Sequence, residues 1–124
     1  MTQEVHLAGA IIVSTPQKVA LADATKGLNM FKKVNIPIVG MIENMSYFQT
    51  PNGDRFEIFD YGGVKKEAYK NNIKFLGEIP IDIEVRKNSD NGIPICIDNP
   101  QNTVSQIYNT IAKTVINITD QKSP

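Results

Sequence analysis

The sequence predicts a single α/β domain built on a mostly parallel sheet, and three observations favour that fold class. Short apolar runs alternate along the chain with segments whose apolar residues recur every three or four positions. The apolar runs are nearly continuous, which is typical of strands that helices cover on both faces. The chain has 124 residues, 41% of them hydrophobic and 21% charged, which suits one domain with its own core. Strands that alternate with helices indicate β-α-β units with right-handed crossovers.

The first unit is a strand over residues 8–13, followed by a helix that reaches about Lys33. Thr15 is expected to cap this helix, and Pro16 is tolerated at the first helical position. The predicted inner face of the helix has apolar residues at spacings of three and four: Ala20, Ala24, Leu28 and Phe31.

The next strand is predicted over residues 36–42, and residues 47–59 are expected to form a β-hairpin that projects from the sheet. The hairpin turn is the run Pro51-Asn52-Gly53-Asp54, in which Asn-Gly favours a two-residue connection. The apolar residues of the predicted return strand are Phe56, Ile58 and Phe59.

The rest of the chain predicts three more helices and one more strand. A helix should open at Gly62 and reach about Asn72, and a strand should follow over residues 74–79. Asp82 can cap a short helix that ends near Gly92, where a left-handed glycine is expected. Residues 95–97 are predicted to be a short edge strand or an extended loop, and residues 119–124 a flexible tail. The last helix has a clear apolar stripe: Val104, Ile107, Tyr108, Ile111, Ala112 and Val115.

Charge and cysteine content exclude several functional classes. Thirteen basic and thirteen acidic side chains cancel, so no electrostatic field favours nucleic acid or an anionic membrane. No apolar run approaches the roughly 20 residues that span a bilayer, and residues 1–6 are typical of neither a signal peptide nor a transit peptide. Cys96 is the only cysteine, which suits a reducing compartment. We therefore expect a cytoplasmic protein with no nucleic-acid or membrane partner.

Two apolar stretches about thirty residues apart end abruptly in polar or turn-forming residues. They are Gly40-Met41-Ile42-Glu43-Asn44-Met45-Ser46-Tyr47-Phe48 and Phe75-Leu76-Gly77-Glu78-Ile79-Pro80-Ile81-Asp82. With these stretches the chain resembles the C-terminal half of the Mrp/ApbC-type P-loop ATPases, iron–sulfur cluster carriers of the MinD/ParA group, from about Leu7 to Ile116. The resemblance implies the C-terminal part of a Rossmann-like three-layer sandwich over residues 1–124, with the hairpin projecting from it.

The resemblance also implies an adenine site at the carboxyl ends of the strands. Asn44 would contact the base, because a side-chain amide offers both a donor and an acceptor; the alternative is that Asn44 only caps a turn. Backbone groups of the loop Pro80, Ile81, Asp82 and Ile83 would line the other side. Arg86 lies in a segment that packs beside the nucleotide in the family, although a solvated helix explains its charge equally well.

Glu43 and Glu78 also end corresponding strands and could approach each other. A carboxylate pair inferred from topology alone is weak evidence for a site.

Two parts of the family's machinery are missing from the sequence. No Gly-x-x-x-x-Gly-Lys-Ser/Thr loop is present, so the phosphates and Mg²⁺ would be held by a half that would precede this one. The Cys-Pro-x-Cys motif that would follow Phe48 reads Thr50-Pro51-Asn52-Gly53, and threonine and asparagine cannot replace thiolates on iron. Cys96 is expected to be a small buried hydrophobe.

The preferred hypothesis is therefore the C-terminal half of an ATP-binding and ATP-hydrolysing iron–sulfur cluster carrier or assembly protein. The complete protein would use ATP with Mg²⁺, form a homodimer and serve iron–sulfur apoproteins, whereas this chain alone is expected not to hydrolyse ATP. The alternative is a non-catalytic dimerisation or partner-binding module that has lost both roles. A MinD/ParA-like positioning ATPase is disfavoured, because the last helix lacks the basic face of a membrane-targeting tail.

Overall fold

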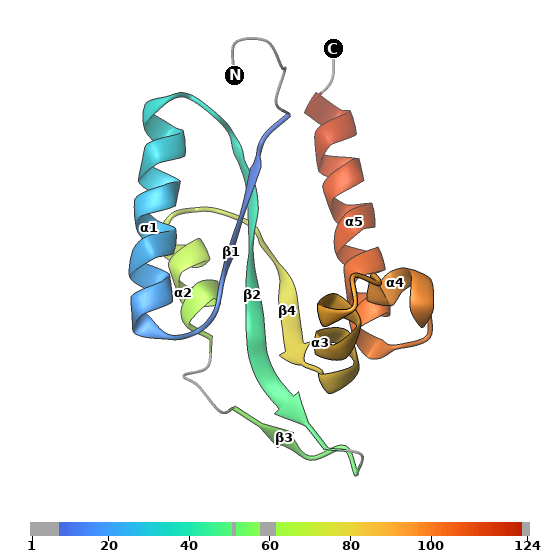
Figure 1. Ribbon diagram of the computed structural model, residues 1–124. Coiled ribbons are helices and arrows are strands. Elements are labelled where there is room, and N and C mark those ends of the chain that lie inside the picture. Colours follow the sequence, from blue (N-terminus) through green and yellow to red (C-terminus); the bar gives the residue numbers. More distant parts are fainter. Residues whose placement is uncertain (1–7, 51, 58–61, 123–124) are drawn as a thin grey trace.

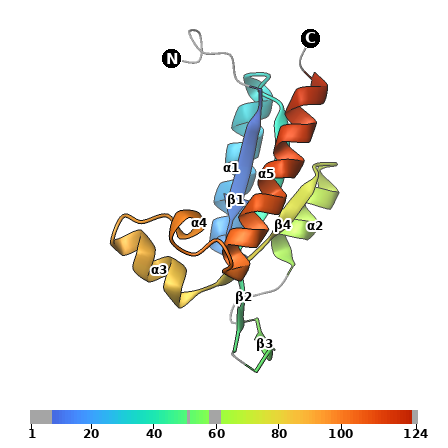
Figure 2. The same ribbon diagram turned by 90° about the vertical axis from the view of Figure 1, so that its right-hand side faces the viewer.

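The computed structural model describes residues 8–50, 52–57 and 62–122, and it places a sheet between two helical layers (Figure 1). One face of the sheet is covered by α1 (Lys18–Lys33) and α2 (Gly63–Lys70). The other face is covered by α5 (Thr103–Lys122), with α4 (Ile95–Asp98) packed against it and the short helix α3 (Ile83–Asp90) packed against α4 (Figure 2). The expected α/β sandwich is therefore present.

The sheet is mixed, with β2 (Ile38–Gln49) at its centre. β1 (Ala10–Ser14) and β4 (Phe75–Ile81) pair with β2 in parallel on opposite sides. β3 (Arg55–Phe56) pairs with the far end of β2 in the antiparallel sense. All three parallel strands therefore end at the same edge of the sheet, beside the hairpin at the bottom of Figure 1.

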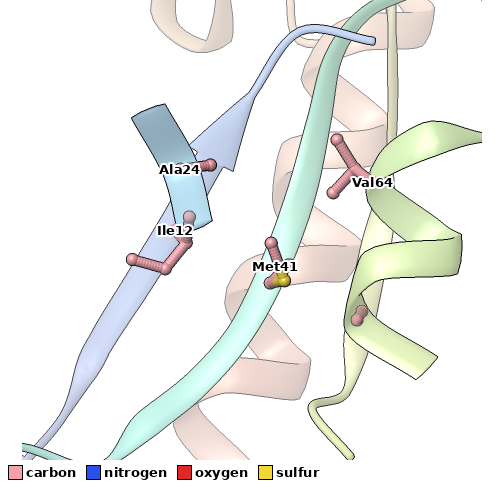
Figure 3. Packing of buried hydrophobic residues seen from close by; sticks show 5 residues of the cluster. Ile12, Ala24, Met41 and Val64 are labelled. Carbon is pink, nitrogen blue, oxygen red and sulfur yellow. The ribbon is translucent and has the colours of Figure 1, made fainter. Parts of the chain in front are cut away.

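The core consists of two clusters, one on each face of the sheet. The first joins β1, β2, α1 and α2 through Ile12, Ala24, Met41, Val64 and Ala68 (Figure 3). The second joins β2 and β4 to α4 and α5 through Ile42, Ile79, Ile95, Val104 and Ile111. Because Met41 and Ile42 are adjacent and point to opposite faces, β2 holds both clusters together.

The start of α1 differs from the sequence prediction. The N-cap is Gln17 and the helix begins at Lys18, so Thr15 and Pro16 lie outside it. Thr15 Oγ1 donates to the side-chain oxygen of Gln17 at 2.8 Å instead of accepting from a helix amide. Pro16 is fully buried in the turn between β1 and α1 and does not open the helix.

Three helices end in the same way. The residue after each C-cap is left-handed: Asn35 after α1, Asn72 after α2 and Gly92 after α3. At Gly92 the amide donates to Ser89 O and the next amide, of Ile93, donates to Asn88 O, which is a Schellman motif. The expected role of Gly92 is confirmed.

The hairpin is only partly as expected. Strand β2 runs on to Gln49, and the loop before β3 is closed by Thr50 N to Asp54 O at 2.8 Å and Gly53 N to Thr50 O at 2.9 Å. This loop is longer than the two-residue connection that Asn-Gly favours. Ile58 and Phe59 of the predicted return strand lie outside the described residues.

Two predictions near the C-terminus are wrong. Residues 95–97 belong to helix α4, neither an edge strand nor an extended loop, because Pro94 O accepts the amides of Ile97 and Asp98. Helix α5 continues to Lys122, so most of the expected tail is helical, and residues 123–124 lie outside the described part of the chain.

Replacing Gly40 with alanine should destabilise the fold by about 1–3 kcal/mol through overpacking. A Cβ atom at Gly40 would lie 2.4 Å from Leu76 Cγ in the neighbouring strand. Gly27→Ala is the matched control, since a Cβ there meets no described atom within 4 Å. It should stabilise the fold by roughly 0.5–1 kcal/mol, because alanine is favoured over glycine within a helix. Urea unfolding measures both variants. A Gly40→Ala protein as stable as the wild type would show that Leu76 does not close over β2.

Candidate functional site

The carboxyl edge of the sheet carries a cavity of about 510 Å³ between the hairpin and the loop after β4. Such an edge is where open α/β sheets bind their ligands. The lining residues come from the end of β2, the hairpin turn, the loop into α3 and the start of α5: Phe48, Gln49, Thr50, Gly53, Pro80, Ile81, Asp82, Ile83, Glu84 and Thr103. All four residues of the predicted loop, 80–83, therefore line one cavity, although Pro80 and Ile81 belong to β4, Asp82 is the N-cap and Ile83 begins α3.

Asn44 and Arg86 are not among the lining residues. Arg86 is exposed on α3. Asn44 was expected where a strand ends near residue 42, but β2 continues to Gln49 and Asn44 lies within it. The strand is irregular at this point, because Met45 is left-handed with φ 53°. Asn44 Oδ1 accepts from Met45 N at 3.0 Å, as in the turn-capping alternative.

The wall formed by the start of α3 is held by a network of hydrogen bonds. Asp82 caps α3 as predicted, with its Oδ1 accepting from Val85 N at 3.0 Å. Asp82 Oδ2 accepts from Asn102 Nδ2 at 3.3 Å, and Glu84 Oε1 accepts from the same amide at 2.6 Å. Glu84 also accepts from Asn99 Nδ2 at 3.1 Å. Both carboxylates of this wall are therefore bound to the segment that leads into α5.

A buried carboxylate lies behind the cavity at the centre of the sheet. Glu43 is fully buried in β2, directly opposite Glu78 of β4. Its Oε1 accepts from Val64 N at 3.2 Å, in the first turn of α2. Helix α2 begins after Gly62, which has no side chain to cap it, so Glu43 supplies the missing acceptor from another element.

Ser46 connects the two glutamates. Its hydroxyl donates to Glu43 Oε2 and lies 3.1 Å from Glu78 Oε2. The expectation that Glu43 and Glu78 approach each other is therefore confirmed, with one serine proton between them. Ser46 itself is fully buried.

The network continues into the hairpin through Arg55. Arg55 Nη2 donates to Glu78 Oε1 at 3.2 Å, and its guanidinium lies 3.7 Å from the centroid of the Tyr47 ring. The guanidinium offsets the charge of the Glu78 carboxylate, and its contacts with Glu78 and the Tyr47 ring fix its orientation. The hairpin is thus anchored to β4 and to β2 by one side chain.

Sequence reasoning missed Ser46, Arg55 and Tyr47. The available signal was the occurrence of Glu43 and Ser46 inside a mostly apolar strand, since buried polar groups require partners. Arg55 gave no comparable signal, because its role depends on where the hairpin folds back.

The residues of the hairpin do not fit a cluster held by thiolates. The turn presents Thr50, Asn52 and Gly53, and Cys96 lies in α4, packed against the α5 side of the core. In the described part of the chain, no three His, Cys, Asp or Glu side chains are grouped so as to hold a metal ion. Nor is any helix of that part long and apolar enough to cross a membrane.

A mostly parallel sheet between two helical layers, with a cavity at its carboxyl edge, defines the class of α/β nucleotide-binding folds. Within that class, the family model described as ParA, NUBPL iron-transfer P-loop NTPase, matches residues 1–116. The chain therefore belongs to this family of iron–sulfur carrier P-loop NTPases.

Two relatives show the extent of the match. The iron–sulfur cluster transfer protein NUBPL of Dictyostelium discoideum is 49% identical over 117 residues, which cover 94% of this chain and 36% of that protein. The iron–sulfur protein required for NADH dehydrogenase, mitochondrial, of Arabidopsis thaliana is 44% identical over 117 residues, 94% of this chain and 37% of that one. The chain thus spans little more than a third of the length of these relatives.

Solved structures agree with the fold. A nucleotide-binding protein of Archaeoglobus fulgidus in complex with ADP is 40% identical, with a TM-score of 0.62 over 73% of this chain and 38% of its own. The cell division ATPase MinD of Pyrococcus furiosus has a TM-score of 0.70 over 90% of this chain and 43% of its own. At 20% identity, MinD supports the fold alone.

Glu43→Ala should lower the free energy of unfolding by about 1–3 kcal/mol, because it leaves the Val64 amide buried without its acceptor and removes the bond from the Ser46 hydroxyl to Glu43. Glu43→Gln keeps one acceptor and should cost less. Asp90→Ala, an exposed carboxylate on α3 that lies outside this network, is the control and should stay within roughly 0.5 kcal/mol of wild type. Urea unfolding gives the energies, and hydrogen exchange at the Val64 amide should accelerate in Glu43→Ala alone. Unchanged exchange there would exclude the capping role.

Proposed function

We propose that this chain forms the adenine side of a nucleotide site in an iron–sulfur cluster carrier, with the phosphates bound outside it. The observation that carries the proposal is the chemistry of the cavity between the hairpin and the loop after β4. Its walls combine apolar side chains, among them Phe48, Ile81 and Ile83, with the polar side chains of Gln49, Thr50 and Thr103. A flat, uncharged heterocycle suits such walls.

Charge argues against phosphate in the same cavity. Among the described residues, its lining includes two acids, Asp82 and Glu84, and no lysine or arginine. Phosphates need cations or clustered backbone amides, and the sequence has no glycine-rich lysine loop to supply them. We infer that ATP contacts this chain only through its base, and that its phosphates and Mg²⁺ are bound outside the chain. The chain alone would then not hydrolyse ATP.

Asn44 and Arg86 keep proposed roles at the edge of the site. In the described part of the chain, Asn44 Nδ2 makes no hydrogen bond, so it is available to an acceptor on the base edge. Arg86 is an exposed cation one helical turn after the Asp82 cap, and its proposed place is beside the base. Backbone groups of residues 80–83 would supply the remaining contacts. The ADP complex of the 40% identical Archaeoglobus protein supports nucleotide binding within this family.

The cargo and assembly are proposed from the family. Relatives are named as iron–sulfur cluster transfer or carrier proteins, so apoproteins that receive clusters are the proposed clients and a homodimer is the proposed assembly. The hairpin of this chain lacks the thiolates to hold a cluster, so a bound cluster would need ligands from outside the hairpin. The cytoplasm is the proposed compartment, and the name of the Arabidopsis relative makes the mitochondrion the alternative. Immunodetection of the native protein in fractionated cells distinguishes the two.

A second candidate function is a non-catalytic partner-binding module. It is favoured by the exposed apolar side chains near and on the hairpin, Met45 and Phe56. This module would bind its partner whether or not adenine nucleotide is present, and an ATP-dependent carrier would not.

Adenosine should bind the chain weakly, with a dissociation constant on the order of 1 mM, because only base contacts are available. We expect saturable shifts of the Phe48, Ile81 and Ile83 amide resonances in ¹H–¹⁵N NMR titrations. Ile83→Glu should weaken binding roughly tenfold, a loss of about 1.4 kcal/mol, because it replaces an apolar contact with a hydrated carboxylate. Ile83 is 60% exposed, so the variant should fold.

Ile97→Glu is the matched control, since Ile97 is 76% exposed on α4 and does not line the cavity. Absence of saturable shifts, or equal binding by both variants, would reject the adenine pocket. Asn44→Ala tests a separate point: if its affinity equals that of the wild type, Asn44 does not contact the base.

A further inference from the structure

The charges of the chain cancel in total but are unevenly distributed over the fold. Helices α1 and α2 with their flanking loops, residues 15–37 and 62–74, contain eight of the thirteen basic side chains and two of the thirteen acids. The rest of the chain therefore has five basic and eleven acidic side chains. The eight cations are all exposed lysines: Lys18, Lys26, Lys32, Lys33, Lys65, Lys66, Lys70 and Lys74. Because α1 and α2 cover the same side of the sheet (Figure 1), overall neutrality conceals a basic layer.

The lysines of α2 are not neutralised by its one acid. Among the described residues, none of the eight lysines forms an ion pair. Glu67 of α2 instead accepts from Thr25 Oγ1 and from Asn71 Nδ2, each at 3.2 Å. Lys65 and Lys66 are the third and fourth residues of the helix, where the helix dipole favours acids. These two cations therefore destabilise α2, and an anion bound beside them would offset that cost.

A hollow of about 480 Å³ lies against the same face of α2. Its described lining residues are spaced by three or four positions and so form one stripe of the helix: Gly62, Lys65, Lys66 and Tyr69. Tyr69 is 87% exposed, more than any other large hydrophobic side chain of the described residues. This outward stripe of α2 thus combines an aromatic ring with two ammonium groups and their apolar stems.

The chemistry of the outward stripe suits an acidic peptide better than nucleic acid or a membrane. Arginine is the preferred cation for nucleic-acid recognition, and the basic layer contains none. A helix that binds a membrane surface inserts a wide apolar face, whereas Val64 and Ala68 of α2 are buried in the core. Carboxylates on both sides of one apolar side chain would complement two ammonium groups beside an exposed ring.

We propose that the outward stripe of α2 docks an acidic segment of a partner protein. Carboxylates of that segment bind the ammonium groups of Lys65 and Lys66, and one aromatic or aliphatic side chain lies in the hollow against the Tyr69 ring. The other lysines of the basic layer attract the segment from a distance. The stripe shares no residue with the lining of the cavity at the carboxyl edge, so the proposal does not depend on base recognition there.

The test measures, by fluorescence anisotropy, binding of the full chain to a labelled short peptide of aspartate and glutamate with one central phenylalanine. Binding should be saturable and should weaken roughly tenfold between low salt and about 0.3 M NaCl, because salt screens the lysines. Lys65→Glu/Lys66→Glu should weaken it at least roughly tenfold by replacing attraction with repulsion. The matched control is Lys87→Glu/Lys113→Glu, which changes the net charge equally through exposed lysines of α3 and α5 and should bind like the wild type.

Tyr69→Ala separates docking in the hollow from general attraction between opposite charges. It should weaken binding of the phenylalanine peptide about fivefold, because an aromatic contact is lost. Binding of a matched peptide with serine in place of phenylalanine should be weaker in the wild type and unchanged by the substitution. The side chain is exposed, so the variant should fold, and circular dichroism checks this for every variant.

Four outcomes would overturn the proposal. They are absence of saturable binding by the wild type, equal loss in the two double variants, equal binding of the phenylalanine and serine peptides, and tighter binding of single-stranded DNA or phosphatidylserine vesicles than of the peptide. Sedimentation of the chain alone adds a fifth: self-association that Lys65→Glu/Lys66→Glu abolishes would assign the outward stripe to a second copy. Adenosine binding by the same preparations reports the nucleotide cavity separately.

Discussion

The placement of a fully buried glutamate in the central strand is the constraint on which the carboxyl edge of the sheet depends. Glu43 can be buried there only because a helix amide and a serine hydroxyl bind it, since an unpaired buried charge costs several kcal/mol. Meeting that requirement places the N-terminus of α2 against β2 and turns Ser46 inward toward Glu78. The same network reaches the hairpin through Arg55. One buried charge therefore links β2, β4, α2 and β3.

The sequence predicts the regular elements well and the irregular ones poorly. The helices α1 and α5 and the Asp82 cap are recognisable because periodicity and capping are local properties. The end of β2 cannot be predicted from local sequence. The strand continues past the left-handed Met45 because β3 and β4 pair with it beyond that residue. Thr15 is a good capping residue by composition, but the N-cap is Gln17, two residues later, and Pro16 between them is buried. Tertiary contacts override local preference at each of these positions.

The residues of the candidate site also differ in whether local sequence could predict them. Residues 80–83 could be placed because β4 ends at Ile81 and Asp82 caps the next helix, so this junction lies at the edge of the sheet. The network of Ser46, Arg55 and Tyr47 could not be placed, because it needs the register of β2 against β4 and the return path of the hairpin. The acidity of the cavity wall is likewise a tertiary property, since Asn99 and Asn102 bring Glu84 to it. That acidity is the reason for proposing that the cavity takes a base and that phosphates bind elsewhere.

The hairpin has no cysteine, and the contacts that hold it in place do not need one. Metal-dependent segments lose their structure when their ligands are removed, because the metal supplies the folding free energy. Here the hairpin is positioned by the Arg55–Glu78 ion pair, the Tyr47 ring and the backbone bonds of the Thr50 turn. None of these contacts involves sulfur or a metal. The hydrogen-bond network that runs from Glu43 to Arg55 therefore anchors the hairpin beside the cavity. The hairpin keeps this position with threonine and asparagine at its tip, whether or not a cluster is bound nearby.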